Sequence, residues 1–302
     1  MKKVLLTTSA LTLLAGAAAA DVTVGATARM GVIHDSVSTR TENRMRINVS
    51  GSGETDGGLT FGAFARFQSG HGPALGATGV MNGSNVWISN GTMTLSMGNI
   101  GGAIDQNGGI YSVGGCGFSS STNYEQYCAN VIGQGNATFA SLSSGGAGPG
   151  ANGIARVDFA LGSANVSVSG GNAYDTELAA TFSLGSATVS VGFDNGVGLG
   201  GGTYISAAFD LGSANIGITG FQDRTAANNT SWILKARFAV GSGNIGVFAA
   251  DDKISGGNRY GINYTQSLGG GATAYVSVSD QQFAGAFSAA GTTVAAGLTF
   301  GF

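Results

Sequence analysis

The chain has 302 residues, of which 43% are hydrophobic and only 10% are charged, and its formal net charge is −3. A soluble domain carries roughly 25% charged residues, so the composition argues against an ordinary soluble protein, and the lack of a basic excess argues against a nucleic-acid partner. Glycine is abundant at 55 residues while proline numbers only 2, which favours tight turns over an unordered chain.

Residues 1–20 have the pattern of a secretory signal peptide. Two lysines at the start precede an apolar stretch, which ends in an A-x-A cleavage site at Ala20. This stretch is short for a transmembrane anchor. We therefore expect the mature chain to be residues 21–302, forming one domain, and we find in it no further apolar run long enough for a membrane-spanning helix.

From residue 22 onward, apolar and polar residues alternate with period two. Such alternation gives a β-strand one apolar and one polar face, whereas a helix, with a period of 3.6, would present no clean face. Sixteen segments carry the pattern in chain order: 22–33, 42–53, 58–69, 83–89, 92–98, 152–161, 164–170, 174–184, 187–194, 202–211, 214–221, 230–240, 244–250, 257–268, 272–280 and 291–302.

A Leu-Gly-Ser-Ala motif recurs at 161–164, 184–187 and 211–214, with looser copies at 240–245 and 268–272. Each copy predicts a strand, a tight glycine turn and a strand, separated from the next copy by a longer return loop. Short turns at one end and longer loops at the other are typical of an outer-membrane barrel. We predict an all-β fold, a transmembrane 16-stranded antiparallel β-barrel. A soluble sandwich or β-solenoid is the alternative, but its outside would carry more charge.

Four arginines fall on the polar set of the first three strands: Arg29, Arg44, Arg46 and Arg66. An arginine on the lipid face near the membrane midplane would cost roughly 2–4 kcal/mol, so we expect these side chains to line the lumen as one basic group. The same argument applies more weakly to Arg156, Lys235, Arg237 and Arg259.

The connection from about 99 to 151 is by far the longest, and a loop of this length is usually functional or disordered. It carries Asp105 and Glu125, which either line a pore constriction opposite the arginines or are ordinary solvated loop charges. It also carries Cys116 and Cys128, for which export to an oxidising compartment predicts a disulfide.

Three segments, in this order, resemble the Gram-negative general porin family, particularly its alphaproteobacterial members. They are DVTVG at 21–25, GTMTLSMGN at 91–99 and the terminal strand VAAGLTFGF at 294–302. The resemblance implies a 16-stranded barrel, a homotrimer, and a constriction loop at 99–151 folded into the pore. It also implies that the assembly machinery reads the terminal aromatic residues, here Phe300 and Phe302, and that the partners are outer-membrane lipid and lipopolysaccharide.

The sequence therefore predicts an outer-membrane porin: a water-filled channel for passive diffusion of small polar solutes and ions, without enzymatic activity, catalytic cofactor or metal centre. The alternatives are a substrate-specific channel and, less favoured, an adhesin-type or enzymatic barrel. A histidine-based site is not indicated, because the histidines number only 2 and no motif brings them to a nucleophile. The pair Asp251-Asp252 is either a structural Ca²⁺ site at the outer rim or solvated loop charge.

Overall fold

The computed structural model describes residues 21–71, 80–107, 153–171, 174–195, 202–223, 230–253, 257–282 and 290–302. Within these ranges it contains sixteen strands and one short helix, α1 (Ala103–Asn107). The strands are β1 (Asp21–His34), β2 (Thr39–Glu54), β3 (Thr60–His71), β4 (Val80–Ser89), β5 (Met93–Gly98), β6 (Ile154–Leu161), β7 (Ala164–Gly171), β8 (Tyr174–Leu184), β9 (Ala187–Asp194), β10 (Gly202–Asp210), β11 (Ala214–Asp223), β12 (Thr230–Val240), β13 (Gly243–Asp252), β14 (Gly257–Gly269), β15 (Ala272–Gln281) and β16 (Gly291–Gly301).

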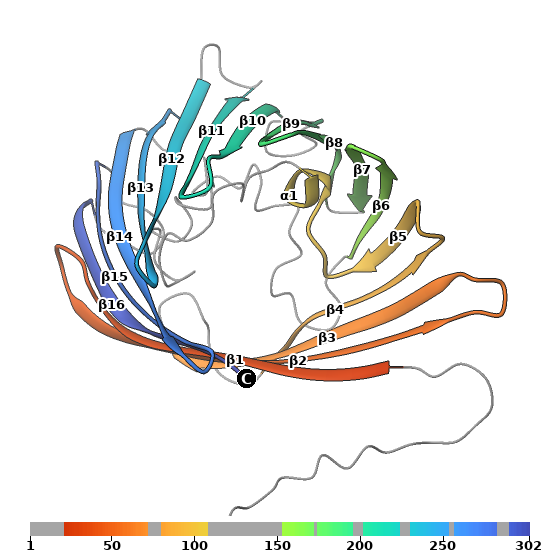
Figure 1. The fold of residues 1–302 in the computed structure, drawn as a ribbon, viewed down its shortest axis with the longest axis horizontal. Coiled ribbons are helices and arrows are strands. Elements are labelled where there is room, and N and C mark those ends of the chain that lie inside the picture. Colours follow the sequence, from red (N-terminus) through yellow and green to blue (C-terminus); the bar gives the residue numbers. More distant parts are fainter. Residues whose placement is uncertain are drawn as a thin grey trace, which may run out of the picture.

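The strands form one closed antiparallel barrel in which each strand pairs with its neighbours in sequence and β16 pairs with β1 (Figure 1). At the closure, Phe302 N donates to Ala26 O at 2.9 Å and Ala26 N donates to Phe302 O at 3.3 Å. Closure pairs the edge strands, which is what allows a sheet to stand in lipid. The predicted 16-stranded barrel is confirmed, and each predicted segment overlaps an observed strand.

The repeated sequence motif forms the tight turns of the barrel. Its glycines have φ values of +72° at Gly162, +70° at Gly185 and +79° at Gly212. This left-handed region is accessible to glycine at little cost and is strained for other residues. The repeat therefore marks one end of the barrel, where successive strands are joined by turns of a few residues.

The two faces of the wall alternate as the sequence predicts. On β1, Val22 is 67% exposed and Val24 is 68% exposed, whereas Arg29 is 4% exposed. The same inversion recurs on β12, where Leu234 is exposed and the neighbouring Lys235 is buried. Exposed apolar and buried polar side chains are the reverse of a soluble protein, and they fit a wall with lipid outside and a polar interior.

Aromatic residues stand on the outward face near both ends of the strands. Near the tight turns lie Phe182, Phe209 and Phe238, and toward the other end lie Trp232 and Tyr260, all of them exposed. Aromatic girdles at the two membrane interfaces are a property of transmembrane barrels. No helix among the described residues is long and apolar enough to cross a membrane.

Helix α1 lies inside the barrel and packs against β7, β8 and β9 (Figure 1). Its Ile104 is buried and belongs to an apolar cluster on the inner wall, which includes Ala179, Tyr204, Phe221 and Phe248. A Cβ at Gly192 would stand 2.9 Å from Ile104 Cγ1, so the absence of a side chain at Gly192 lets the helix approach β9. The alternation in the sequence predicted a polar inner face, so this apolar patch on the inner wall was not expected.

Some of the sequence predictions fall outside the described residues. They are the signal peptide at residues 1–20, the disulfide between Cys116 and Cys128, and the placement of Glu125. These stay predictions.

Candidate functional site: the charged lining of the pore

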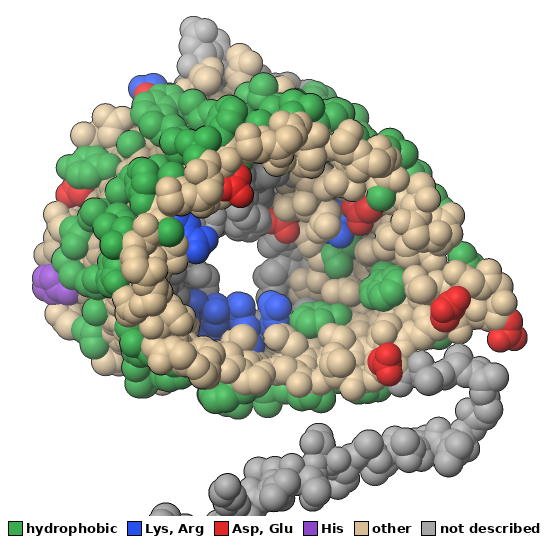
Figure 2. All heavy atoms as spheres, viewed as in Figure 1, with side chains coloured by type: hydrophobic (Ala, Val, Ile, Leu, Met, Phe, Trp, Pro, Cys, Tyr) green, Lys and Arg blue, Asp and Glu red, His purple; other side chains and the backbone are tan. Residues whose placement is uncertain are grey.

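Arg29, Arg44, Arg46 and Arg66, here called the basic wall, share the inner face of β1, β2 and β3. The pairing of the strands shows that they share this face: Arg29 on β1 is the cross-strand partner of Arg44 on β2, and Arg66 on β3 is the cross-strand partner of Asn48 on β2. The outward positions between them carry exposed apolar residues such as Met30 and Met45. Figure 2 shows an opening through the barrel with Lys and Arg side chains along the side formed by these strands.

The partners of these arginines differ in charge. Arg29 Nη2 forms an ion pair with Glu42 Oε1, and both side chains are buried. Arg46 Nε donates to Gln68 Oε1 at 2.6 Å, and Arg66 Nε donates to Asn48 Oδ1 at 3.0 Å. The guanidinium carbon of Arg66 also lies 5.4 Å from the centre of the Phe64 ring, within reach of a cation–π contact.

Arg40 extends the same inner face of β2, two residues before Glu42, and sequence reasoning missed it. Its Nη1 pairs with Asp35 Oδ2 in the turn between β1 and β2. Asp35 Oδ1 also accepts from Val37 N at 3.0 Å and Ser38 N at 2.8 Å. Burial alone would raise the pKa of Asp35, but these hydrogen bonds outweigh it and lower the pKa from 3.8 to about 2. Arg40 could have been found from the sequence, because it lies four residues before Arg44 on the same strand and therefore on the same face.

The weaker candidates divide between two parts of the wall. Lys235 and Arg259 are buried on the inner faces of β12 and β14, and Arg237 shares the inner phase of Lys235. Arg156 on β6 is instead held by a carboxylate, since its Nε lies 2.9 Å from Asp158 Oδ1 and 3.0 Å from Oδ2.

Carboxylates gather across the opening from the basic wall. Glu177 on β8 and Asp194 on β9 are direct cross-strand partners, and each is 1% exposed. Asp105 lies on α1, which packs against the same strands. We call Asp105, Asp158, Glu177 and Asp194 the acidic side. The sequence indicated Asp105 and missed Glu177 and Asp194, although both stand on the polar set of their strands.

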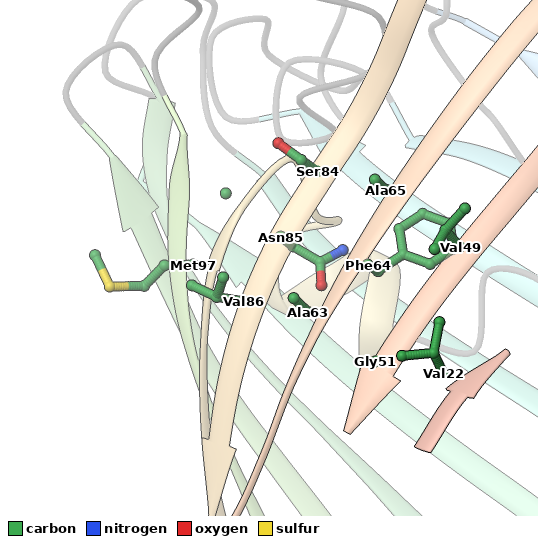
Figure 3. A pocket seen from close by; sticks show the side chains of 11 residues that line it. Val22, Val49, Gly51, Ala63, Phe64, Ala65, Ser84, Asn85, Val86 and Met97 are labelled. Atoms are coloured by element: carbon green, nitrogen blue, oxygen red, sulfur yellow. The ribbon is translucent and has the colours of Figure 1, made fainter. Parts of the chain in front are cut away.

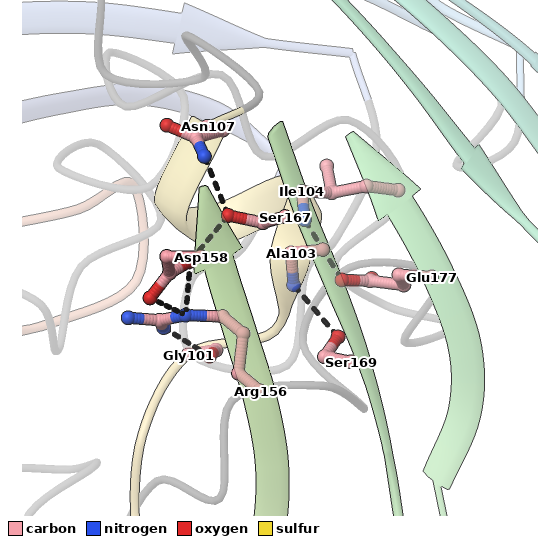
Figure 4. A network of polar contacts seen from close by, with 9 residues as sticks. All are labelled: Gly101, Ala103, Ile104, Asn107, Arg156, Asp158, Ser167, Ser169 and Glu177. Atoms are coloured by element: carbon pink, nitrogen blue, oxygen red, sulfur yellow. Dashed lines mark hydrogen bonds and ion pairs between the residues drawn. The ribbon is translucent and has the colours of Figure 1, made fainter. Parts of the chain in front are cut away.

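A polar network fixes the segment that carries Asp105 (Figure 4). Ala103 N donates to Ser169 Oγ at 2.7 Å, and Ile104 N donates to Glu177 Oε2 at 2.9 Å. Arg156 Nη1 donates to Gly101 O at 2.6 Å just before the helix. The first N–H groups of a helix have no partner within it, so the wall of the barrel supplies the acceptors that α1 lacks.

At the far end of the network, Asn107 reaches β7 and β8. Its Nδ2 donates to Ser167 Oγ, which in turn donates to Asp158, and Thr181 Oγ1 donates to Asn107 O. The start of the predicted constriction loop is thus an ordered helical turn bonded to the wall, rather than an irregular loop throughout.

The remaining sequence candidates are placed as follows. Phe300 and Phe302 stack at the end of β16, with ring centres 6.4 Å apart. Asp251 and Asp252 belong to β13 rather than to a loop, and Asp251 Oδ2 lies 2.9 Å from Lys253 Nζ. Among the described residues, no group of three or more His, Cys, Asp or Glu side chains is arranged to hold a metal ion.

A closed barrel that is apolar outside and charged inside, with a helix held in its lumen, defines a multi-pass outer-membrane β-barrel of the channel type. The sequence matches the Gram-negative porin family over residues 7–286. The chain belongs to that family.

The comparisons with individual proteins agree. A stretch of 63 residues is 43% identical to a porin of Fuscovulum blasticum, covering 21% of this chain and 22% of that porin. Two solved structures of engineered variants of the Rhodopseudomonas blastica porin, a double mutant and a triple mutant, match with a TM-score of 0.76 at 21% and 22% identity. Both matches cover 93% of this chain and 100% of the other, which shows the shared fold.

Proposed function

We propose that the protein is a general diffusion channel, which passes small polar solutes and ions down their gradients. The observation that carries this proposal is the division of charge across the opening. Arginines stand on β1, β2 and β3, and carboxylates stand on β6, β8, β9 and α1 (Figure 2). Opposed charges across a narrow section order water and favour polar over apolar solutes, so the lining filters by size and charge.

The helix supports this proposal because it narrows the lumen in a fixed place. Hydrogen bonds from Ala103, Ile104 and Asn107 tie α1 to β7 and β8. A docked segment gives one constant cross-section, which suits a passive filter. Such a channel would work without a cofactor.

Liposome swelling tests the proposal. Purified protein reconstituted into liposomes is expected to admit neutral sugars at rates that fall with solute size and rise linearly with concentration. Protein-free liposomes and liposomes with heat-denatured protein are the controls. Absence of solute-dependent swelling would contradict the proposal.

A substrate-specific channel is the second candidate, favoured by aromatic residues on the inner wall. Tyr204, Phe221, Phe248 and Tyr275 lie on the inner faces of β10, β11, β13 and β15. Their rings are almost fully buried, and those of β10, β11 and β13 cluster with Ile104 of α1. We therefore favour the general channel, and uptake that saturates for one solute would reverse this preference.

The proposed assembly is a homotrimer in contact with outer-membrane lipid and lipopolysaccharide. A groove on the wall at β1 to β5 supports a protein contact there (Figure 3). Its lining combines small residues with exposed apolar ones, including Gly51, Ala63, Val22, Val86 and Met97. Small residues leave a hollow that side chains of a second copy could fill. Light scattering of the detergent-extracted protein, corrected for bound detergent, is expected to give three times the chain mass.

A further inference from the structure

Two aromatic side chains and an arginine follow one another on the inner face of β3 and β4. Phe64 and Arg66 are two residues apart on β3 and therefore share a face, and the guanidinium carbon of Arg66 lies 5.4 Å from the centre of the Phe64 ring. Trp87 on β4 is the direct cross-strand partner of Gly62, which precedes Phe64 by two residues on the same face of β3. We call Trp87, Phe64 and Arg66 the aromatic row.

The indole of Trp87 lies over Gly62. A Cβ at Gly62 would stand 2.6 Å from Cε2 of Trp87 and 2.7 Å from its Nε1, so the ring occupies the space that a side chain at this position would need. Gly62 and Phe64 are about 7 Å apart along the strand. The missing side chain at Gly62 thus places the indole at the position next to Phe64 on the inner wall.

The other inner aromatic residues are packed differently. Those of β10, β11 and β13 are almost fully buried and cluster with Ile104 of α1. Phe64 and Trp87 are only half-buried, so part of each ring stays accessible. Apolar ring surface in a polar lumen is open to a solute that has an apolar face of its own, because burying that surface on binding is favourable.

Arg66 adds a positive charge at one end of the row. Its Nε donates to Asn48 Oδ1 at 3.0 Å, and the Phe64 ring gives the guanidinium a cation–π contact. Nη1 and Nη2 carry four further N–H groups, and they take part in no hydrogen bond that is found among the described residues. A guanidinium held in this way can bind a carboxylate through two parallel hydrogen bonds.

We propose that Trp87, Phe64 and Arg66 form a binding site for small aromatic carboxylates on the wall of the pore. The ring of the solute packs against the indole and the edge of the Phe64 ring, and its carboxylate accepts hydrogen bonds from Nη1 and Nη2 of Arg66. This inference rests on the proposed channel function and adds to it a class of solute. Neutral sugars carry no carboxylate and pass without engaging Arg66.

The affinity follows from the size of the two contacts. Aromatic packing and a charge-assisted hydrogen bond are each modest in the presence of water, so a dissociation constant on the order of 10 mM is expected. Binding of this strength lets the solute leave again, as passage through a channel requires.

Current block in planar bilayers tests the site. Sodium benzoate replaces sodium acetate at constant ionic strength while the single-channel current is recorded. Acetate has the same charge but no ring. The current is expected to fall in a saturating manner as benzoate rises, with half of the effect at a concentration on the order of 10 mM. Benzyl alcohol, which has the ring without the charge, should block less.

Variants separate the two contacts. Trp87→Ala is expected to raise the half-blocking benzoate concentration roughly three- to ten-fold, and Arg66→Gln by about ten-fold or more. Trp87→Phe keeps an aromatic ring and should stay close to wild type. Trp232→Ala is the matched control, because Trp232 is exposed on the outer face of β12 and should leave the block unchanged.

Fluorescence gives a second measurement that does not depend on conduction. The chain has 2 tryptophans, so Trp232→Phe leaves Trp87 as the only one. Acrylamide, a quencher dissolved in water, is expected to quench Trp87 in this variant and benzoate to protect it. In Trp87→Phe the remaining Trp232 is covered by detergent, so acrylamide should quench it less and benzoate should not change its quenching.

A benzoate block that Trp87→Ala and Arg66→Gln weaken supports the inference. Equal currents in benzoate and acetate, or wild-type block in Trp87→Ala, overturn it while the channel function stands. Absence of any conductance in the wild-type protein would overturn the channel function. In that case the fluorescence still decides the site: protection of Trp87 by benzoate supports it, and a lack of protection overturns it.

Discussion

Ile104 and Glu177, 73 residues apart in the chain, are joined by a hydrogen bond of 2.9 Å from the main-chain nitrogen of Ile104 to Oε2 of Glu177. The bond connects the helix inside the lumen to the barrel wall at a point where both residues are buried. Because a buried N–H without a partner is costly, this contact favours a docked α1 over a detached one. The position of Asp105 in the pore depends on that docking.

Glu177→Ala is expected to loosen α1. It removes the acceptor of Ile104 N, a loss of about 1–3 kcal/mol for a buried donor left unsatisfied, and single-channel recordings should show a larger mean conductance with more open-channel noise. Glu177→Gln is the matched control, since its amide oxygen still accepts the bond. If both variants behave as the wild type does, the hydrogen bond does not hold the helix.

Gly192→Ala addresses the packing side of the same contact. The added Cβ would stand 2.9 Å from Ile104 Cγ1, which is closer than side chains normally approach, so Ile104 must shift. We expect a conductance change in the same direction as for Glu177→Ala. Gly220→Ala serves as the control, because there the nearest atom is Ile205 Cγ2 at 3.7 Å, an ordinary contact.

The turn of Asp35 is expected to lose stability in acid. Its pKa is lowered from 3.8 to about 2, so the folded state favours the charged carboxylate. The stabilisation is fully present above about pH 4 and is lost as the pH falls toward 2. Thermal unfolding in detergent, followed by circular dichroism, should show Asp35→Asn less stable than wild type at pH 6 and nearly equal to it at pH 2. A constant difference across that range would contradict the assignment.

The sequence predicted the barrel well because alternation with period two identifies the segments that form strands and also assigns each residue to one of the two faces of the wall. The spacing of Arg44 and Arg46 predicts that they share a face, and the cost of an arginine in lipid predicts that this face is the inner one. Strand number follows from counting segments between turn motifs, and the positive φ at Gly162 and Gly185 explains why those motifs recur.

Contacts between distant strands could not be predicted in this way. The pairing of Arg29 with Glu42 depends on register between β1 and β2, and the bond from Ile104 to Glu177 joins a loop to a strand far along the chain. Glu177 and Asp194 both lie on the polar faces of their predicted strands, but only the cross-strand pairing of β8 with β9 shows that they are neighbours. Predicting a cluster of charged side chains therefore requires the register between neighbouring strands, and the alternation of apolar and polar residues does not determine that register.

Deleting Phe302 is expected to impair barrel assembly. Its main chain exchanges two hydrogen bonds with Ala26 where β16 closes on β1, and its ring stacks on Phe300 at the C-terminal end of β16. The deletion should leave unassembled, protease-sensitive protein, scored by heat-modifiable migration on gels. Phe302→Tyr keeps the aromatic ring and should assemble as wild type does. Normal assembly of the deletion would contradict a role for the terminal residue.

Arg44→Ala combined with Arg46→Ala is expected to raise conductance and shift selectivity toward cations. The substitutions remove two positive charges from the inner face of β2, opposite the acidic side, and shorten two side chains that project into the lumen. The shift should be largest at 0.01 M salt, where the Debye length is about 30 Å, and small at 1 M. Asp105→Asn and Glu125→Gln should each move selectivity the other way, because they remove negative charge from the predicted constriction loop. Reversal potentials under a salt gradient measure both effects. If the double arginine variant keeps wild-type conductance and reversal potential at low salt, the basic wall does not form the narrowest section, and the section that governs permeation lies elsewhere in the lumen.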